Sequence, residues 1–162
     1  MILDILFTFI LFYILIYISK EDIKTMLISE RKLVLFFILG ISYLFYSGYS
    51  DEKINSINLI LNNIFSMFIV FLLMSSISCI GYKLFRTNSL GLGDIKLSSI
   101  SSIWLGMKMS FISLLISFFL SAIYSVYGKI FKQFKTFHQY PFAPFLSIGI
   151  FCSWILDKIK TF

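Results

Sequence analysis

The hydrophobic residues of this chain gather in long runs that short polar segments separate. Six runs stand out, at residues 2–18, 33–46, 57–85, 95–107, 109–131 and 142–156. A helix needs about 20 residues to cross a bilayer, so for the shorter runs either flanking lysines and aromatic residues must help or the helix continues into its polar loop. The pattern predicts an all-α, polytopic integral membrane protein with about six transmembrane helices.

The composition agrees with a membrane protein. Hydrophobic residues make up 59% of the 162 residues and charged residues 14%, whereas soluble domains carry about 25% charged residues. Because the runs occupy most of the chain, we expect residues 1–162 to form a single membrane-embedded domain. The first run contains Asp4 and lacks both a basic start and a small-residue cleavage site. We therefore expect a permanent helix there and not a signal peptide.

The distribution of positive charge predicts an orientation in the membrane. Lysine and arginine gather in the first, third and fifth connections between runs, at Lys20, Lys24, Arg31, Lys32, Lys83, Arg86, Lys96, Lys129, Lys132 and Lys135. Because such residues are retained on the cytoplasmic side, these connections should be cytoplasmic and both termini should lie outside. Orientation then explains the net charge of +6, and we do not expect nucleic acid as a partner.

Few residues suit metal, redox or serine-type chemistry. Cys79 and Cys152 lie far apart within apolar runs, which leaves no Cys-x-x-Cys pair for zinc or for redox exchange. His138 is the single histidine, and it lies in a basic loop with no serine or cysteine motif around it. We therefore expect no catalytic histidine, no metal site and no cofactor.

Two aspartates at the ends of apolar runs are the candidates for chemistry. Asp22 follows the first run and Asp94 precedes the fourth, so both fall on the predicted cytoplasmic side. Ionisable groups near membrane helices are costly, and two carboxylates at one depth can share a proton and activate water. Taken singly, each has another interpretation: Asp94 as a helix N-cap, and Asp22 as a solvated residue beside lysines.

Three segments together resemble a known family. Residues 22–29 read D-I-K-T-M-L-I-S, residues 91–97 read G-L-G-D-I-K-L, and residues 140–149 read Y-P-F-A-P-F-L-S-I-G. In this order they resemble the D-x-x-x-x-x-I-P, G-x-G-D-x-K-L and P-F-x-P-x-L segments of the type IV prepilin peptidases, which are membrane aspartyl proteases. Ser29 departs from the pattern, because the family usually has a proline at that position.

The resemblance implies both a site and an activity. The catalytic residues would be Asp22 and Asp94, with motif positions at Gly91, Gly93, Lys96, Pro141 and Pro144. The implied activity is endoproteolytic removal of leader peptides from prepilin-like proteins, at the cytoplasmic face of a prokaryotic inner membrane. Larger members carry a cysteine-rich N-terminal region associated with methylation of the product. This chain has no such region, so we expect no S-adenosylmethionine-dependent methyltransferase activity.

Structural roles are also expected for several of these positions. The two prolines suit the start of the last helix, and Lys96 suits a snorkelling position at the membrane surface. Serines repeat every four residues along the fifth run and predict a packing seam, and three more share the face of Asp94: Ser113, Ser117, Ser121 and Ser125, then Ser98, Ser101 and Ser102. Two rival functions remain, a small ion- or proton-coupled transporter and a noncatalytic component of a pilus or secretion assembly.

Overall fold

The computed structural model describes residues 2–50, 56–86, 90–131 and 140–161, and all of the regular structure in these ranges is helical. The helices are α1 (Ile2–Thr25), α2 (Glu30–Ser50), α3 (Ser56–Phe85), α4 (Leu92–Ile130) and α5 (Ala143–Thr161). The prediction of an all-α protein is therefore confirmed. The first helix does not end with its apolar run, because α1 continues through Asp22 to Thr25.

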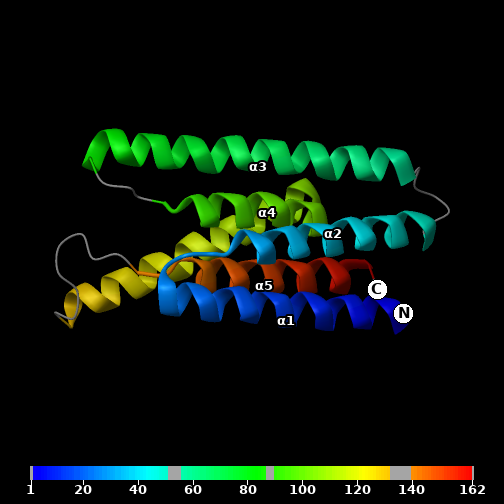
Figure 1. Ribbon diagram of the computed structural model, residues 1–162, viewed down its shortest axis with the longest axis horizontal. Coiled ribbons are helices and arrows are strands. Elements are labelled where there is room, and N and C mark those ends of the chain that lie inside the picture. The colour runs from blue at the N-terminus through cyan, green and yellow to red at the C-terminus, as the bar shows by residue number, and fades with distance from the viewer. Residues whose placement is uncertain (1, 51–55, 87–89, 132–139, 162) are drawn as a thin grey trace.

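The helices form an elongated bundle (Figure 1). Helix α4 packs against α2, α3 and α5, while α1 packs against α2 and α5 on the side away from α3. Both chain termini lie at one end of the bundle. The end of α1, the start of α2, the end of α3, both ends of α4 and the start of α5 lie at the opposite end. The first, third and fifth basic connections therefore leave helices at the same end.

Helix α4 doubles back on itself at Gly106. This residue has φ 68° and ψ 176°, a conformation open to glycine and outside the helical region. Figure 1 shows the arm before Gly106 running toward the termini and the arm after it returning. Asn63 of α3 donates its Nδ2 hydrogen to the carbonyl of Ile103 at 3.0 Å, and Ser110 Oγ donates to the carbonyl of Gly106 at 2.6 Å. These bonds satisfy backbone groups that the break would otherwise leave unpaired in an apolar layer.

The two arms of α4 correspond to the fourth and fifth predicted runs. Within the described residues, four helices are long and apolar enough to cross a membrane, namely Leu3–Thr25, Glu30–Tyr49, Ile57–Leu84 and Leu92–Ile130. Helix α5, which contains the sixth run, is not among them. A membrane protein is thus supported, and the count of six spans stays a prediction.

An aromatic cluster around Trp104 fixes the first arm of α4 in the core. The Trp104 ring stacks on Tyr43 with an interplanar angle of 7°, and its Nε1 hydrogen is donated to the carbonyl of Phe36 at 3.2 Å. Trp154 of α5 meets Trp104 edge-on, with ring centroids 5.8 Å apart. A Cβ atom on Gly40 would lie 2.7 Å from Trp104 Nε1, so the glycine makes room for the ring.

The serine seam predicted for the fifth run lies on the second arm of α4. Ser113, Ser117 and Ser121 are buried, and Ser125 is half-buried. Gly149 of α5 packs so closely there that a side chain on it would collide with the Ser117 hydroxyl and the Ser113 carbonyl. The prediction of a small-residue packing seam is therefore confirmed.

Candidate active site

Asp22 lies in the last turn of α1, and its side chain reaches the start of α5. The residue is 5% exposed, and its Oδ2 accepts the backbone N–H of Ala143 at 3.0 Å. The next amides of α5, those of Phe145 and Leu146, donate to the carbonyl of Phe142. A carboxylate at a helix N-terminus is stabilised by the free N–H groups and by the helix dipole.

The proline segment shapes the helix end that receives Asp22. Pro141 precedes α5 and Pro144 is its second residue, which agrees with the role expected for both. Because Pro144 has no N–H, the Ala143 amide is the donor that this first turn offers to Asp22. Tyr140 ties the same segment to the second arm of α4 through a 2.9 Å hydrogen bond with Ser121.

Asp94 lies in the first turn of α4 and is 9% exposed. The N-cap of α4 is Gly91 and not Asp94, so the expectation of a simple aspartate cap is wrong in detail. The Asp94 amide donates to the Gly91 carbonyl at 3.1 Å, and the Asp94 carboxylate is hydrogen-bonded by the Gly91 backbone. This reciprocal arrangement resembles a capping box. Asp94 therefore helps to cap the N-terminus of α4, whatever chemical role it also has.

One oxygen of Asp94 remains available for chemistry. Its Oδ1 is buried and has no hydrogen-bond partner among the described residues. Buried polar atoms are almost always paired, so such an atom calls for an explanation. The Asp22 carboxylate acts on Asp94 by direct Coulomb interaction. Asp22, in the last turn of α1, and Asp94, in the first turn of α4, therefore lie at the same end of the bundle, near enough for the charge of one carboxylate to act on the other, although they are far apart in sequence.

The two motif glycines allow close approach at Asp94. A Cβ atom on Gly93 would lie 3.1 Å from Cβ and 3.2 Å from Cγ1 and Cδ1 of Ile28, which belongs to the turn between α1 and α2. A Cβ atom on Gly91 would lie 3.1 Å from Asp94 Oδ2. A side chain at either glycine would therefore displace the turn or the carboxylate.

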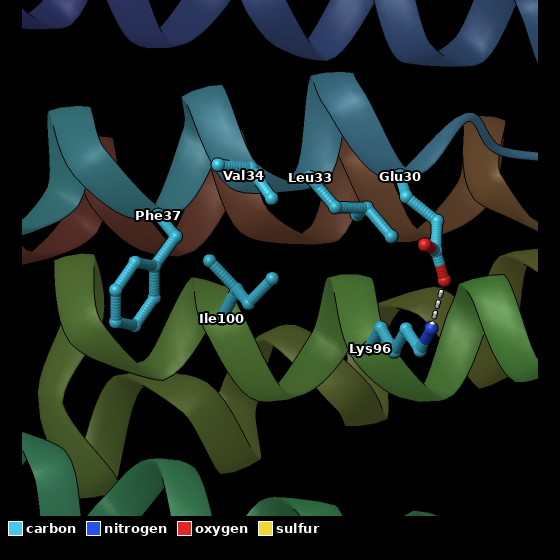
Figure 2. A pocket seen from close by; sticks show the side chains of 6 residues that line it. All are labelled: Glu30, Leu33, Val34, Phe37, Lys96 and Ile100. Atoms are coloured by element: carbon cyan, nitrogen blue, oxygen red, sulfur yellow. Dashed lines mark hydrogen bonds and ion pairs between the residues drawn. The ribbon is translucent and has the colours of Figure 1, made fainter.

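Lys96 pairs with an acid of α2. Its Nζ pairs with Glu30 Oε1 at 2.6 Å, with 47% of the Lys96 side chain and 80% of the Glu30 side chain exposed. This ion pair closes one end of a shallow groove of about 250 Å³ between α2 and α4 (Figure 2). The groove is lined by Glu30, Leu33, Val34, Phe37, Lys96 and Ile100.

The serines on the face of Asp94 do not bond to its carboxylate. The hydroxyl of Ser98 donates to the carbonyl of Ile95 at 3.0 Å, and the hydroxyl of Ser101 donates to that of Ser98 at 2.6 Å. Ser102 likewise bonds to its own helix. These contacts agree with the packing role expected for the three residues.

The turn from residue 26 to residue 29 was not foreseen as part of the site. Glu21 Oε2 accepts the backbone N–H of Ser29 at 3.1 Å and lies 3.2 Å from Lys32 Nζ. An acid beside Asp22 was the available signal, but no spacing rule relates a side chain at position 21 to an amide at position 29. The Ala143 amide was missed for the same reason, because backbone donors leave no trace in the residue pattern.

Among the described residues, no group of three or more His, Cys, Asp or Glu side chains comes together to hold a metal ion. Cys79 and Cys152 are free and exposed. The prediction about His138 lies outside the described residues.

Comparison with known proteins identifies the family. The type IV leader peptidase family matches residues 9–126, a span that includes Asp22, Gly91, Gly93 and Asp94 and ends before the proline segment. No curated protein and no solved structure matches the chain. The family match covers well over half of the 162 residues. The chain therefore belongs to the type IV leader peptidase family.

Proposed function

We propose that this protein is a membrane aspartyl endopeptidase that cleaves leader peptides from prepilin-like proteins. The observation that carries the proposal is the burial of Asp22 and Asp94 at the same end of the bundle, where the charge of Asp22 acts on Asp94. The matched family is a leader peptidase family, and both residues fall within the match. Neither acid forms an ion pair among the described contacts, which distinguishes them from the paired acids Asp4, Glu21 and Glu30.

The proposed mechanism uses one proton shared between the two carboxyl groups. Two neighbouring carboxylates do not both ionise cheaply, so in this mechanism one group is ionised and the other protonated. The ionised group takes a proton from the attacking water, and the protonated group polarises the scissile carbonyl and then protonates the leaving amine. The atoms balance, because water supplies a hydroxyl group to the new C-terminus and a proton to the new N-terminus.

The surroundings favour different roles for the two acids. Asp22 accepts the Ala143 amide at the N-terminus of α5, and such a donor favours the ionised form of a carboxylate. Asp94 has a buried Oδ1 without a hydrogen-bond partner among the described residues, which suits a protonated group that donates to a substrate carbonyl. We therefore assign water activation to Asp22 and carbonyl polarisation to Asp94.

The substrate class is taken from the matched family, and the position of the two acids is compatible with it. Both are at helix ends, near the basic residues Lys20 and Lys24 in the last turns of α1 and Arg31 in the first turn of α2. The positive-inside rule supports a cytoplasmic position for this end, in the cytoplasmic membrane of a prokaryote. A protein whose basic leader precedes an apolar helix would present its cleavage site at that boundary. The proposed activity does not include methylation of the new N-terminus.

The proposal is tested by incubating membranes that contain the protein with a candidate prepilin and mapping the new N-terminus by mass spectrometry. A single cut between the basic leader and the apolar segment is expected, without a methyl group when S-adenosylmethionine is added. Intact substrate, or cleavage equal to that by membranes lacking the protein, would contradict the proposal. A methylated product would contradict only the proposal that the protein does not methylate the new N-terminus.

A further inference from the structure

The turn between α1 and α2, residues 26–29, is fastened to α1 by a side chain next to Asp22. Glu21 Oε2 accepts the Ser29 amide hydrogen at 3.1 Å and pairs with Lys32 Nζ at 3.2 Å. Lys32 also donates to the carbonyl of Tyr17 at 3.3 Å and lies 3.3 Å from the centroid of the Tyr17 ring. Lys32 therefore fixes the Glu21 carboxylate, and that carboxylate binds the amide of Ser29, the last residue of the turn.

The turn needs such a fastening because its first residue is strained. Met26 has φ 52°, in the left-handed region that residues with a Cβ atom disfavour. Its amide donates to the carbonyl of Asp22 at 2.8 Å, so the strained residue closes the helical turn that carries the aspartate. The unfavourable backbone conformation of Met26 must be offset by contacts of the turn with other residues, such as the hydrogen bond between Glu21 and Ser29.

The same turn also touches the start of α4. Ile28 lies against Gly93, the residue before Asp94, as closely as the absence of a side chain there permits. Within the described residues, no Cα atom of α1 lies within 8 Å of a Cα atom of α4. The backbones that carry Asp22 and Asp94 are thus related through the turn, through α2 and through α5, not by direct packing of the two helices.

We propose that Glu21 is a positioning residue for the aspartate pair: by fastening Ser29, it fixes the turn against Gly93 and so sets the separation of Asp22 and Asp94. This inference rests on the proposed peptidase function. Glu21 acts through the turn and does not take part in the chemical step. Its loss should therefore change the rate of the bound complex more than the affinity for substrate.

The residue at position 29 offers a specific test. A proline there, as in the segment that the sequence resembles, restricts φ and has no N–H to satisfy. Serine lacks that restriction, and its amide takes the Glu21 carboxylate as acceptor. If Glu21 acts by accepting the Ser29 amide, then replacing Glu21 should lower kcat strongly when residue 29 is serine. The same replacement should lower kcat little in the Ser29→Pro background.

The experiment compares steady-state cleavage of a prepilin-derived peptide by variants at matched membrane abundance. Glu21→Gln keeps an acceptor oxygen, whereas Glu21→Met has similar length and no acceptor. We expect Glu21→Met to lower kcat about tenfold with an unchanged KM, and Glu21→Gln and Ser29→Pro to stay within about threefold of wild type. The double variant Glu21→Met with Ser29→Pro should match Ser29→Pro alone. Glu21→Ala, which also lacks the acceptor, replaces Glu21→Met if the latter fails to insert.

A second readout does not depend on activity. A cysteine introduced as Ile28→Cys, with Cys79 and Cys152 replaced by serine, reports whether the turn still lies on α4. Glu21→Met should raise its labelling rate with a water-soluble maleimide severalfold, and adding Ser29→Pro should restore the slow rate. Lys24→Ala, an exposed change on the same helix end, serves as the matched control and should leave the labelling rate unchanged.

The outcomes separate the two proposals. An unchanged kcat and labelling rate in Glu21→Met, or equal losses with and without Ser29→Pro, would overturn the positioning role and leave the peptidase function standing. Absence of prepilin cleavage by the wild-type protein would overturn the peptidase function, and full activity of Asp22→Asn and Asp94→Asn would overturn the aspartate pair as its catalytic group. The labelling experiment would still decide whether Glu21 fastens the turn.

Discussion

Replacing Gly93 by alanine places a methyl group where the turn between α1 and α2 meets α4. The new Cβ atom would lie 3.1 Å from Ile28 Cβ and 3.2 Å from Cγ1 and Cδ1 of the same residue. Carbon atoms in contact lie about 3.5–4.0 Å apart, so the turn and the start of α4 must separate by a few tenths of an ångström. The contact involves the Cβ atom of Ile28, so a rotation of its side chain cannot relieve all of it.

This displacement occurs one residue from Asp94. Since a misplacement of about 1 Å can lower a rate by about a hundredfold, a shift of half that size predicts a loss of about tenfold in kcat. Cleavage of a prepilin-derived peptide is measured at matched membrane abundance, with Gly81→Ala on α3 as the control for removing a helical glycine. Ile28→Ala, which removes Cγ1 and Cδ1, should restore part of the lost rate.

A kcat for Gly93→Ala within about twofold of wild type would refute this reasoning, because it would show that the turn and α4 can separate without disturbing the acids. Equal losses in Gly93→Ala and Gly81→Ala would also refute it. Loss of the protein from the membrane would be visible in the abundance measurement. In that case Ile28→Ala should restore part of the lost membrane abundance of Gly93→Ala, because the contact between the new methyl group and Ile28 would cause that loss.

Three further predictions concern the rest of the molecule. Lys96→Met should leave the midpoint of thermal unfolding in detergent unchanged within error, because its ion pair with Glu30 is exposed to solvent. Gly149→Ala should destabilise the protein by about 1–3 kcal/mol by forcing α5 from the serine seam, visible in the same melts. Single cysteines at Thr25 and Arg86 should label from the same side of intact membranes, and labelling from opposite sides would exclude the pairing of the two aspartates.

The helices and the common end of the two aspartates were predictable from the sequence. The apolar runs indicate which segments are suited to lie in lipid. Two such segments, α2 and α3, separate Asp22 from Asp94 in the chain, so the two aspartates are expected at the same end of the bundle. Hydropathy alone does not give the end of α1: the apolar run ends at residue 18, whereas the helix continues to Thr25, which is one of the two outcomes expected for the short runs. The boundary between the fourth and fifth apolar runs falls at Lys108, because a charged residue interrupts the apolar pattern there. The chain reverses two residues earlier, at Gly106, because glycine can adopt the backbone conformation that the reversal requires.

The partners of the two aspartates depend on tertiary contacts that no local pattern encodes. The Ala143 amide reaches Asp22 across 121 positions of sequence. Ser29 interrupts the family pattern, and the sequence alone does not reveal that Glu21 accepts its amide. Both contacts use backbone N–H groups, which every residue except proline carries. Only the folded arrangement determines which of these groups lies near a carboxylate.

The central claim is most directly tested by measuring prepilin cleavage by Asp22→Asn and Asp94→Asn in membranes of matched abundance. Asparagine retains the shape of each side chain and an oxygen that can accept the Ala143 or Gly91 amide, so the fold and the helix ends should persist. It cannot exchange a proton as a carboxylate does, so each variant should lose cleavage by about a thousandfold. Near-normal cleavage by either variant would contradict an aspartate pair as the catalytic group.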